Sequence, residues 1–317
     1  MSIFSPIRTN TLSTHQHFKI IAQWLFVCAA LIFILALIGA ATRLSESGLS
    51  ITEWRPITGV LPPLTEADWD QAFALYKATP EYAQKNMNMT ISEFQTIFYW
   101  EWAHRLGGRL IGFFFLIPFI GFLIAGWIRW RLAFILLAIF ALGGLQGKIG
   151  WFMVQSGLVD HPTVSPYRLA LHLLCAMLLY SSILWLAFSL WARTSLSRPS
   201  IPCRPASWSL YFHTIIVLCA LIITIIWGAF VAGLDAGMIY NEFPTMGTGH
   251  LVPVEMWHLT PPWLNFFENH ASVQFTHRWL AISTILLILS LGVHGVLSHD
   301  TSARLFGSLE IFSLIQR

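Results

Sequence analysis

Three histidines lie within about two turns of the same end of a long apolar stretch: His104, His172 and His277. An ionisable side chain inside a membrane helix is costly to bury, which makes it a functional candidate. Imidazole is also the usual axial ligand of haem iron where two helices face each other. We therefore expect His104 and His172 to hold one haem iron, and His277 to supply one ligand of a second haem. The alternative for each is a histidine hydrogen-bonded between helices.

An acidic residue, Glu101, lies three residues before His104, so the two side chains share one helix face. The other acids of the chain lie in loops, tails or helix boundaries. A carboxylate beside a haem edge can stabilise developing positive charge or relay a proton. We therefore expect Glu101 to be catalytic. The alternative is an acid at a helix start, where the helix dipole favours it.

Four arginines accompany these histidines at the same ends of the apolar stretches: Arg105, Arg109, Arg168 and Arg278. A guanidinium pairs bidentately with a carboxylate, so haem propionates are their expected partners. The alternative is that the side chains extend to lipid headgroups. Lys148 is interpreted in the same way, with the headgroup alternative favoured.

The composition places the chain in a membrane. Of 317 residues, 56% are hydrophobic and only 10% are charged, whereas about a quarter of a soluble domain is charged. A soluble enzyme, a nucleic-acid-binding protein and a secreted disulfide scaffold are therefore excluded. Six apolar stretches are long enough to cross a hydrocarbon core of about 30 Å: 20–42, 105–128, 131–153, 167–191, 208–234 and 278–298. A partial seventh stretch begins near Arg304.

Lysine and arginine are concentrated on one side of these stretches, in the N-terminal tail, the turn at 129–131 and the linker 192–207. The loop 235–269 on the other side holds four acids and no lysine or arginine. By the positive-inside rule the N-terminus is cytoplasmic and the large loops and haem sites face outwards. The long loop 43–97 is expected to form a folded external cap, with helical patterning around Trp69, Phe73 and Tyr76.

The chain contains a weak internal repeat. Gly39-Ala40 and Gly48 correspond to Gly228-Ala229 and Gly237, and a His-Arg pair opens the next stretch in each half. This divides the chain into a tail, 1–19, a first half with the cap, 20–191, a linker, 192–207, and a second half, 208–317. The fold class is an all-α polytopic membrane protein with two pseudo-repeated four-helix bundles, of which six transmembrane helices are clear.

Several motifs resemble the haem A synthase family. They are Thr42–Trp54 followed by Pro62-Pro63-Leu64, Glu101–Arg105, Gly150–Leu158, Arg168–Leu173, Asn265–Asn269 and Gln274–Trp279. Because the external loops contain no cysteine pair, the sequence resembles the mitochondrial and alphaproteobacterial branch of this family. The resemblance runs from about residue 20 to residue 290.

The resemblance implies an eight-helix protein of the bacterial inner membrane that oxidises the C8 methyl of haem O to a formyl group, giving haem A for cytochrome oxidase assembly. His104 and His172 would hold the substrate haem O, Glu101 would be the catalytic carboxylate, and His277 would bind the iron of a haem b cofactor. Membrane lipid, haem O synthase and oxidase assembly factors are the implied partners; nucleic acid is not one.

From about Val293 the resemblance is expected to end, and the sequence stops before helices 7 and 8 could form. This predicts a C-terminally truncated member of the family with an incomplete second haem site. Two alternatives to an active enzyme follow. One is a non-enzymatic b-type protein that binds haem and transfers electrons, and the other is an inactive remnant of a haem A synthase.

Overall fold

The computed structural model describes residues 11–56, 58–159, 161–194, 208–247 and 249–298. Its regular elements there are helices. Six helices are long and apolar enough to cross a membrane, which confirms the expected all-α polytopic class. They are α1 (Thr11–Leu44), α4 (Ile91–Ile124), α5 (Trp130–Gln155), α6 (Pro166–Ala192), α7 (Trp208–Gly233) and α9 (His270–Leu297). The partial seventh stretch near Arg304 lies outside the described residues.

The structure divides into two compact units. Unit 1 comprises residues 1–164 and 175–198, and unit 2 comprises residues 165–174 and 199–317. The division differs from the boundaries expected from sequence, because the first part of α6 groups with unit 2. There Gly233 of α7 lies so close to Pro166 that a Cβ on the glycine would stand 2.7 Å from the proline Cα.

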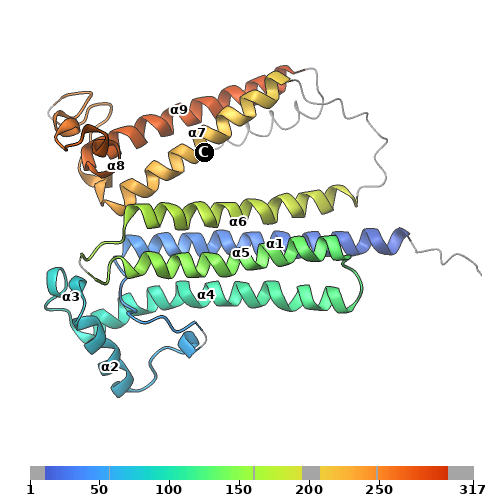
Figure 1. Ribbon diagram of the computed structural model, residues 1–317, viewed down its shortest axis with the longest axis horizontal. Helices are drawn as coiled ribbons and strands as arrows, with labels where there is room; N and C mark the ends of the chain where they lie inside the picture. The colour runs from blue at the N-terminus through green and yellow to red at the C-terminus, as the bar shows by residue number, and fades with distance from the viewer. Residues whose placement is uncertain (1–10, 57, 160, 195–207, 248, 299–317) are drawn as a thin grey trace, which may run out of the picture. The chain divides into compact units, whose positions relative to one another are not determined.

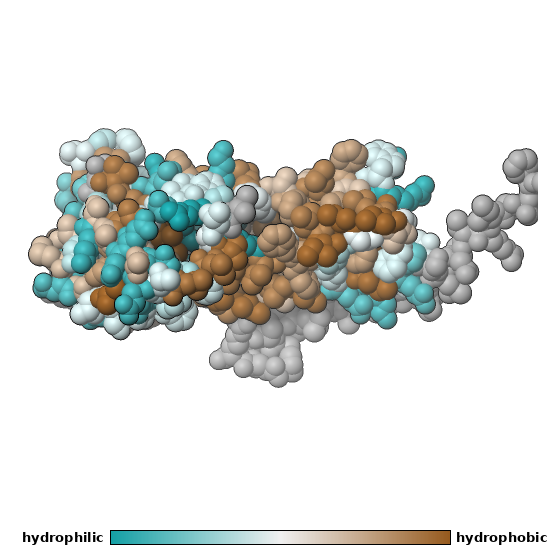
Figure 2. Space-filling model, turned by 90° about the horizontal axis from the view of Figure 1, so that it is seen from below, coloured by the Kyte–Doolittle hydropathy of each residue, from teal (hydrophilic) through white to brown (hydrophobic). Residues whose placement is uncertain are grey.

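In unit 1, helices α1, α4, α5 and the second part of α6 lie side by side (Figure 1). A buried apolar core joins all four, with Leu25 from α1, Phe115 from α4, Leu136 from α5 and Ile183 from α6. On the face seen in Figure 2, hydrophobic residues run along the helices, and hydrophilic residues gather at the end with the cap. This surface agrees with a helix bundle whose sides face lipid.

The cap forms as the helical patterning predicts. It contains the 3₁₀ turn η1 (Thr58–Val60), α2 (Glu66–Lys77) and α3 (Pro80–Gln84). Trp69, Phe73 and Tyr76 of α2 are buried against Phe94 and Phe98, which belong to α4. The last part of the loop predicted at 43–97 is therefore the first two turns of a long helix.

Helix α4 begins at Ile91 because a capping box precedes it. The backbone N–H of Glu93 donates to the Thr90 hydroxyl at 3.3 Å, and the backbone N–H of Thr90 donates to the Glu93 carboxylate at 2.8 Å. Glu101 therefore lies well inside the helix rather than in its first turn. The helix-start alternative for Glu101 is wrong, since the dipole effect falls off within the first turn.

In unit 2, α7 and α9 lie side by side (Figure 1). The Thr224 and Thr284 hydroxyls hydrogen-bond between them at 2.8 Å. The connection from α7 to α9 contains η2 (Ala236–Met238), η3 (Val254–Trp257), η4 (Pro262–Leu264) and α8 (Asn265–Glu268). Asn265 and Asn269, both buried, hold this connection together through hydrogen bonds to backbone groups of Leu259 and Glu255.

Candidate functional site

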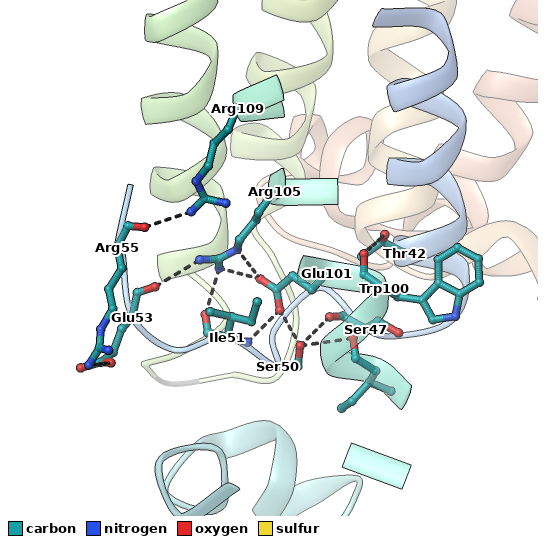
Figure 3. Close-up of polar contacts among 11 residues, drawn as sticks. Thr42, Ser47, Ser50, Ile51, Glu53, Arg55, Trp100, Glu101, Arg105 and Arg109 are labelled. Carbon is teal, nitrogen blue, oxygen red and sulfur yellow. Dashed lines mark hydrogen bonds and ion pairs between the residues drawn. The ribbon is translucent and has the colours of Figure 1, made fainter. Parts of the chain in front are cut away.

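The carboxylate of Glu101 is the centre of a hydrogen-bond network in unit 1 (Figure 3). The residue is 3% exposed. Its Oε1 accepts from Arg105 Nη2 at 2.6 Å and Nε at 3.0 Å. Its Oε2 accepts from the Ser50 hydroxyl at 2.7 Å and from the backbone N–H of Ile51 at 2.8 Å. An ionised carboxylate only accepts hydrogen bonds, and all four of these contacts are donors to it.

Arg105 also fastens the loop after α1 onto α4. Its Nη2 donates to the backbone oxygen of Ile51 at 2.9 Å, and its Nη1 donates to that of Glu53 at 3.1 Å. One turn further on, Arg109 donates to the backbone oxygens of Arg55 and Pro56, both at 2.9 Å. Most N–H groups of Arg105 therefore donate hydrogen bonds within the protein. By contrast, Nη1 of Arg109 is buried without a hydrogen bond in the described part of the chain. The propionate role of both stays a prediction.

The imidazole of His104 lies with its Cε1 atom against a helix position that has no side chain. A Cβ on Gly39 of α1 would stand 2.8 Å from the Cε1 atom of His104, closer than real Cβ contacts allow. The ring also lies beside the backbone of Leu35. Its Nδ1 is buried and has no hydrogen-bond partner among the described residues. Such an imidazole fits an iron ligand, because it is fixed in place without a side-chain partner.

His277 of α9 has the same surroundings in unit 2. A Cβ on Gly228 of α7 would stand 2.9 Å from its Cε1 atom, and the ring lies beside the backbone of Thr224. Its Nδ1 is likewise buried and without a partner within the residues described. Gly39 and Gly228, noted from sequence only as part of a repeat, are thus the positions that admit the two histidine rings.

Arg105 and Arg278 make corresponding hydrogen bonds in the two units, which shows that the sequence repeat is also a structural repeat. Arg278 Nη2 donates to the Tyr240 backbone oxygen at 3.2 Å and its Nη1 to that of Glu242 at 2.8 Å. These oxygens occupy the repeat positions of Ile51 and Glu53, the partners of Arg105. The left-handed residues Glu46 (φ 50°) and Asp235 (φ 52°) also correspond.

The repeat differs at the acidic position. Gln274 of α9 stands where Glu101 stands in α4, three residues before the histidine. Its Nε2 donates to the backbone oxygens of Gly237 and Tyr240, both at 3.0 Å. Its Oε1 is buried and makes no hydrogen bond in the part of the chain that the structure describes. The second unit therefore presents a neutral donor where the first presents an acceptor.

The remaining predicted residues lie on α5 and α6. His172 and Arg168 belong to residues 165–174 of α6, which form part of unit 2, while His104 belongs to unit 1. The pairing of His104 with His172 therefore stays a prediction. Lys148 is exposed on α5. Ser50, which contacts Glu101, was not singled out from sequence, although it lies within the Thr42–Trp54 motif.

Comparisons with known proteins assign the chain to a family. The family model described as "Cytochrome oxidase assembly protein" matches residues 22–316, beyond Val293, where the resemblance was expected to end. A "Heme A synthase" of Rhodospirillum centenum is 53% identical, over 86% of this chain and 71% of the relative. A protein of the same name from Nitrosospira multiformis is 45% identical, over 89% of this chain and 79% of the relative. No solved structure matches the chain.

A third relative with the same name, from Parvibaculum lavamentivorans, is 44% identical over 87% of this chain and 78% of its own length. Alphaproteobacterial proteins are among the relatives, as the lack of a cysteine pair in the external loops predicts. The segment matched by the family model, residues 22–316, includes helices of both units and all the site residues described above. This chain therefore belongs to the cytochrome oxidase assembly protein family whose curated members include the haem A synthases.

Proposed function

We propose that this protein is a haem A synthase, which oxidises the C8 methyl of haem O to a formyl group and so supplies haem A for cytochrome oxidase assembly. The names of the relatives that match most of the chain support this function. The observation that carries it is the buried Glu101 carboxylate, which is fixed by four hydrogen bonds and lies three residues from His104, whose buried Nδ1 makes no hydrogen bond among the described residues.

His104 fits a ligand of the substrate iron, because its ring is held by Gly39 and its Nδ1 has no protein partner in the described structure. We infer that His172 supplies the second ligand from α6. The basic residues Arg105, Arg109 and Arg168 would lie near the propionates. Nη1 of Arg109 is buried, makes no hydrogen bond among the described residues and is available for this purpose.

Glu101 is the residue that we assign to catalysis. Oxidation of a methyl group withdraws electrons and releases protons from one carbon. A fixed negative charge near that carbon stabilises the positive charge that develops, and the same carboxylate can accept a proton. Ser50, Ile51 and Arg105 hold the carboxylate at a fixed position, so it needs no reorganisation when the charge develops.

Unit 2 fits the binding of a haem b cofactor. His277 has the same glycine contact and the same unpartnered Nδ1 as His104, and Arg278 is placed as Arg105 is. A haem b bound there would supply one-electron transfer. The residues of the chain would orient it through His277 and Arg278, and Gln274 adds no charge to the site.

The six membrane-spanning helices support a multi-pass membrane location. We further propose that this membrane is the bacterial inner membrane, with the N-terminus in the cytoplasm and the cap and both histidine sites at the periplasmic side. The distribution of lysine and arginine supports this orientation. A haem O synthase is the proposed functional neighbour, because it makes the substrate, and oxidase assembly factors are proposed to receive the product.

The proposal is tested by mass spectrometry of haem extracts from cells that accumulate haem O, with and without this chain. We expect haem A, or its hydroxylated intermediate, only in cells that express it. The Glu101→Ala variant should keep bound haem and lose the product, while Glu66→Gln, which changes an exposed acid of the cap, should keep both. Untouched haem O with the chain verified in the membrane would reject the enzyme and favour a protein that only binds haem.

A further inference from the structure

A second pair of histidines lies between α7 and α9, at the end of these helices opposite to His277. The Nδ1 atoms of His213 and His294 stand 3.1 Å apart, and the ring centroids are 5.4 Å apart. Both side chains are half-buried. His294 follows His277 by 17 residues on one helix, which corresponds to about 25 Å along the axis. The pair is therefore separate from the proposed haem b site.

The tautomer of His213 follows from its contact with Ser290. The Ser290 hydroxyl donates its proton to the backbone oxygen of Leu287 at 2.9 Å, so towards His213 it can only accept. The Nε2 atom of His213 lies 3.0 Å from this hydroxyl and must carry the N–H that donates to it. The Nδ1 atom of His213 then carries a lone pair that faces His294. Metal-binding histidines are commonly fixed in this way, by a hydrogen bond from the other ring nitrogen.

The distance between the two Nδ1 atoms matches two ligands on adjacent positions of one small ion. With Zn–N bonds of about 2.0–2.1 Å, two nitrogens at a tetrahedral angle stand about 3.3 Å apart. Ligands on opposite faces of a haem iron would stand about 4 Å apart at the same bond lengths. The pair therefore fits a cis arrangement on a bare ion and does not fit haem.

Helix packing does not require histidines at this place. The repeat positions in unit 1 are Trp24 of α1 and Gly121 of α4. There the Trp24 indole donates to the backbone oxygen of Phe114 at 3.1 Å and contacts the ring of Phe115. Aromatic packing thus joins the helices of unit 1 at the same level without any histidine. The pair in unit 2 is an addition to the repeated scaffold.

We propose that His213 and His294 form a binding site for a divalent transition-metal ion of the zinc class, which links α7 to α9. Imidazole nitrogens are suited to zinc, copper and nickel. The described residues contain no third histidine, cysteine or acid grouped with this pair. The two imidazoles are therefore the ligands that the described part of the chain supplies to the ion. The site goes beyond the proposed synthase reaction, in which it takes no part.

The test uses the full chain in lipid nanodiscs, purified without a histidine tag and treated with a chelator. One equivalent of Cu²⁺ serves as the probe, because copper binds nitrogen sites more tightly than zinc does. We expect electron paramagnetic resonance to show two coordinated imidazole nitrogens, and Zn²⁺ to compete for the site. His213→Ala and His294→Ala should each abolish the two-nitrogen signal. His161→Ala, which removes an exposed histidine elsewhere, should leave it intact.

Two further variants separate metal binding from folding. Asn at position 294 can still donate to Nδ1 of His213 but is a poor ligand, so His294→Asn should keep the metal-free unfolding temperature and lose the copper signal. Ser290→Ala should weaken copper binding by about 10–100-fold, the usual effect of removing such a support. An unchanged two-nitrogen signal in His294→Asn, or in both alanine variants, would overturn the proposal and leave the pair as an ordinary hydrogen bond.

Discussion

The two units share one arrangement of glycine, histidine and arginine but differ in the residue three places before the histidine, which is Glu101 in unit 1 and Gln274 in unit 2. In unit 1 the backbone N–H of Ile51 donates to the carboxylate of Glu101. At the equivalent place in unit 2 the backbone oxygen of Tyr240 accepts from the amide of Gln274. The backbone oxygens of Ile51 and Tyr240 both accept from the arginine that follows the histidine, and the histidine, the glycine and the arginine are retained. The difference therefore lies in the side chain at the acidic position and in the backbone group that it contacts.

Comparing the two units separates the side chains proposed to bind haem from the side chain proposed to take part in the reaction. The shared features are an imidazole against a glycine and an arginine that holds the loop. We propose that they position the haem in each unit. The feature present in unit 1 alone is a fixed negative charge, which is what an oxidation that develops positive charge requires. We therefore assign the reaction to unit 1 and electron transfer to unit 2.

The largest effect is expected when unit 1 is given the side chain of unit 2. Glu101→Gln keeps the size of the side chain and removes its charge, so haem A formation should fall by between about a hundredfold and ten-thousandfold. Haem content should be unchanged, because His104 is untouched. Product formation is measured by mass spectrometry and haem content by absorbance. Turnover near the wild-type rate would show that the charge is not what distinguishes the two units.

The next effect concerns the feature that the units share. In Gly39→Ala and Gly228→Ala the added Cβ would lie within 2.8 and 2.9 Å of a histidine ring carbon, so the ring must move. Overpacking of this kind costs about 1–3 kcal/mol. Each variant should lose haem from its own unit alone, seen in the reduced absorbance spectrum. Gly112→Ala is the matched control, since its Cβ would meet nothing within 4 Å. Equal haem loss in all three would refute the steric reason.

Sequence alone predicts the helices of this protein better than it predicts the contacts between them. The sequence makes Glu101 and His104 candidates because an acid and a histidine are conspicuous in apolar surroundings, and their roles stay predictions. Ser50 is not a candidate from sequence, because a serine in a polar loop does not indicate a contact until the loop folds back onto α4. The start of α4 at Ile91 was missed for a related reason. A search for apolar spans excludes the polar first turns, which a capping box and the cap core stabilise.

A reciprocal exchange should disturb unit 2 without making it catalytic. Gln274→Glu places a buried carboxylate against the backbone oxygens of Gly237, which loses its donor, and of Tyr240, which keeps only Arg278. Unsatisfied buried groups cost about 1–3 kcal/mol. The thermal unfolding temperature should therefore fall, and haem A formation should not rise. Gln84→Glu, at an exposed position of α3, should leave both unchanged. A gain in product would mean that the loop adapts to the charge.

The smallest effect should come from a tyrosine–glutamate pair that each unit places in its connecting segment. In the cap, Glu81 is 3% exposed and accepts from the Tyr76 hydroxyl at 3.0 Å. Burial raises the pKa of Glu81 from 4.5 to about 7. In unit 2, Glu255 is exposed and accepts from Tyr240 at 2.6 Å, and this hydrogen bond lowers its pKa.

The two pairs should therefore respond to pH in opposite ways. Because the pKa of Glu81 is raised on folding, its contribution to stability is full below pH 4.5 and is lost as pH rises through about 7. Amide hydrogen exchange in α2 and α3 should speed up over this range beyond the intrinsic pH effect. Glu81→Gln should abolish the excess, whereas Glu255→Gln should not alter it. If the excess survives in Glu81→Gln, another group near the cap must carry it, and Lys85 and Glu46, which form an ion pair at 3.2 Å, are the next to change.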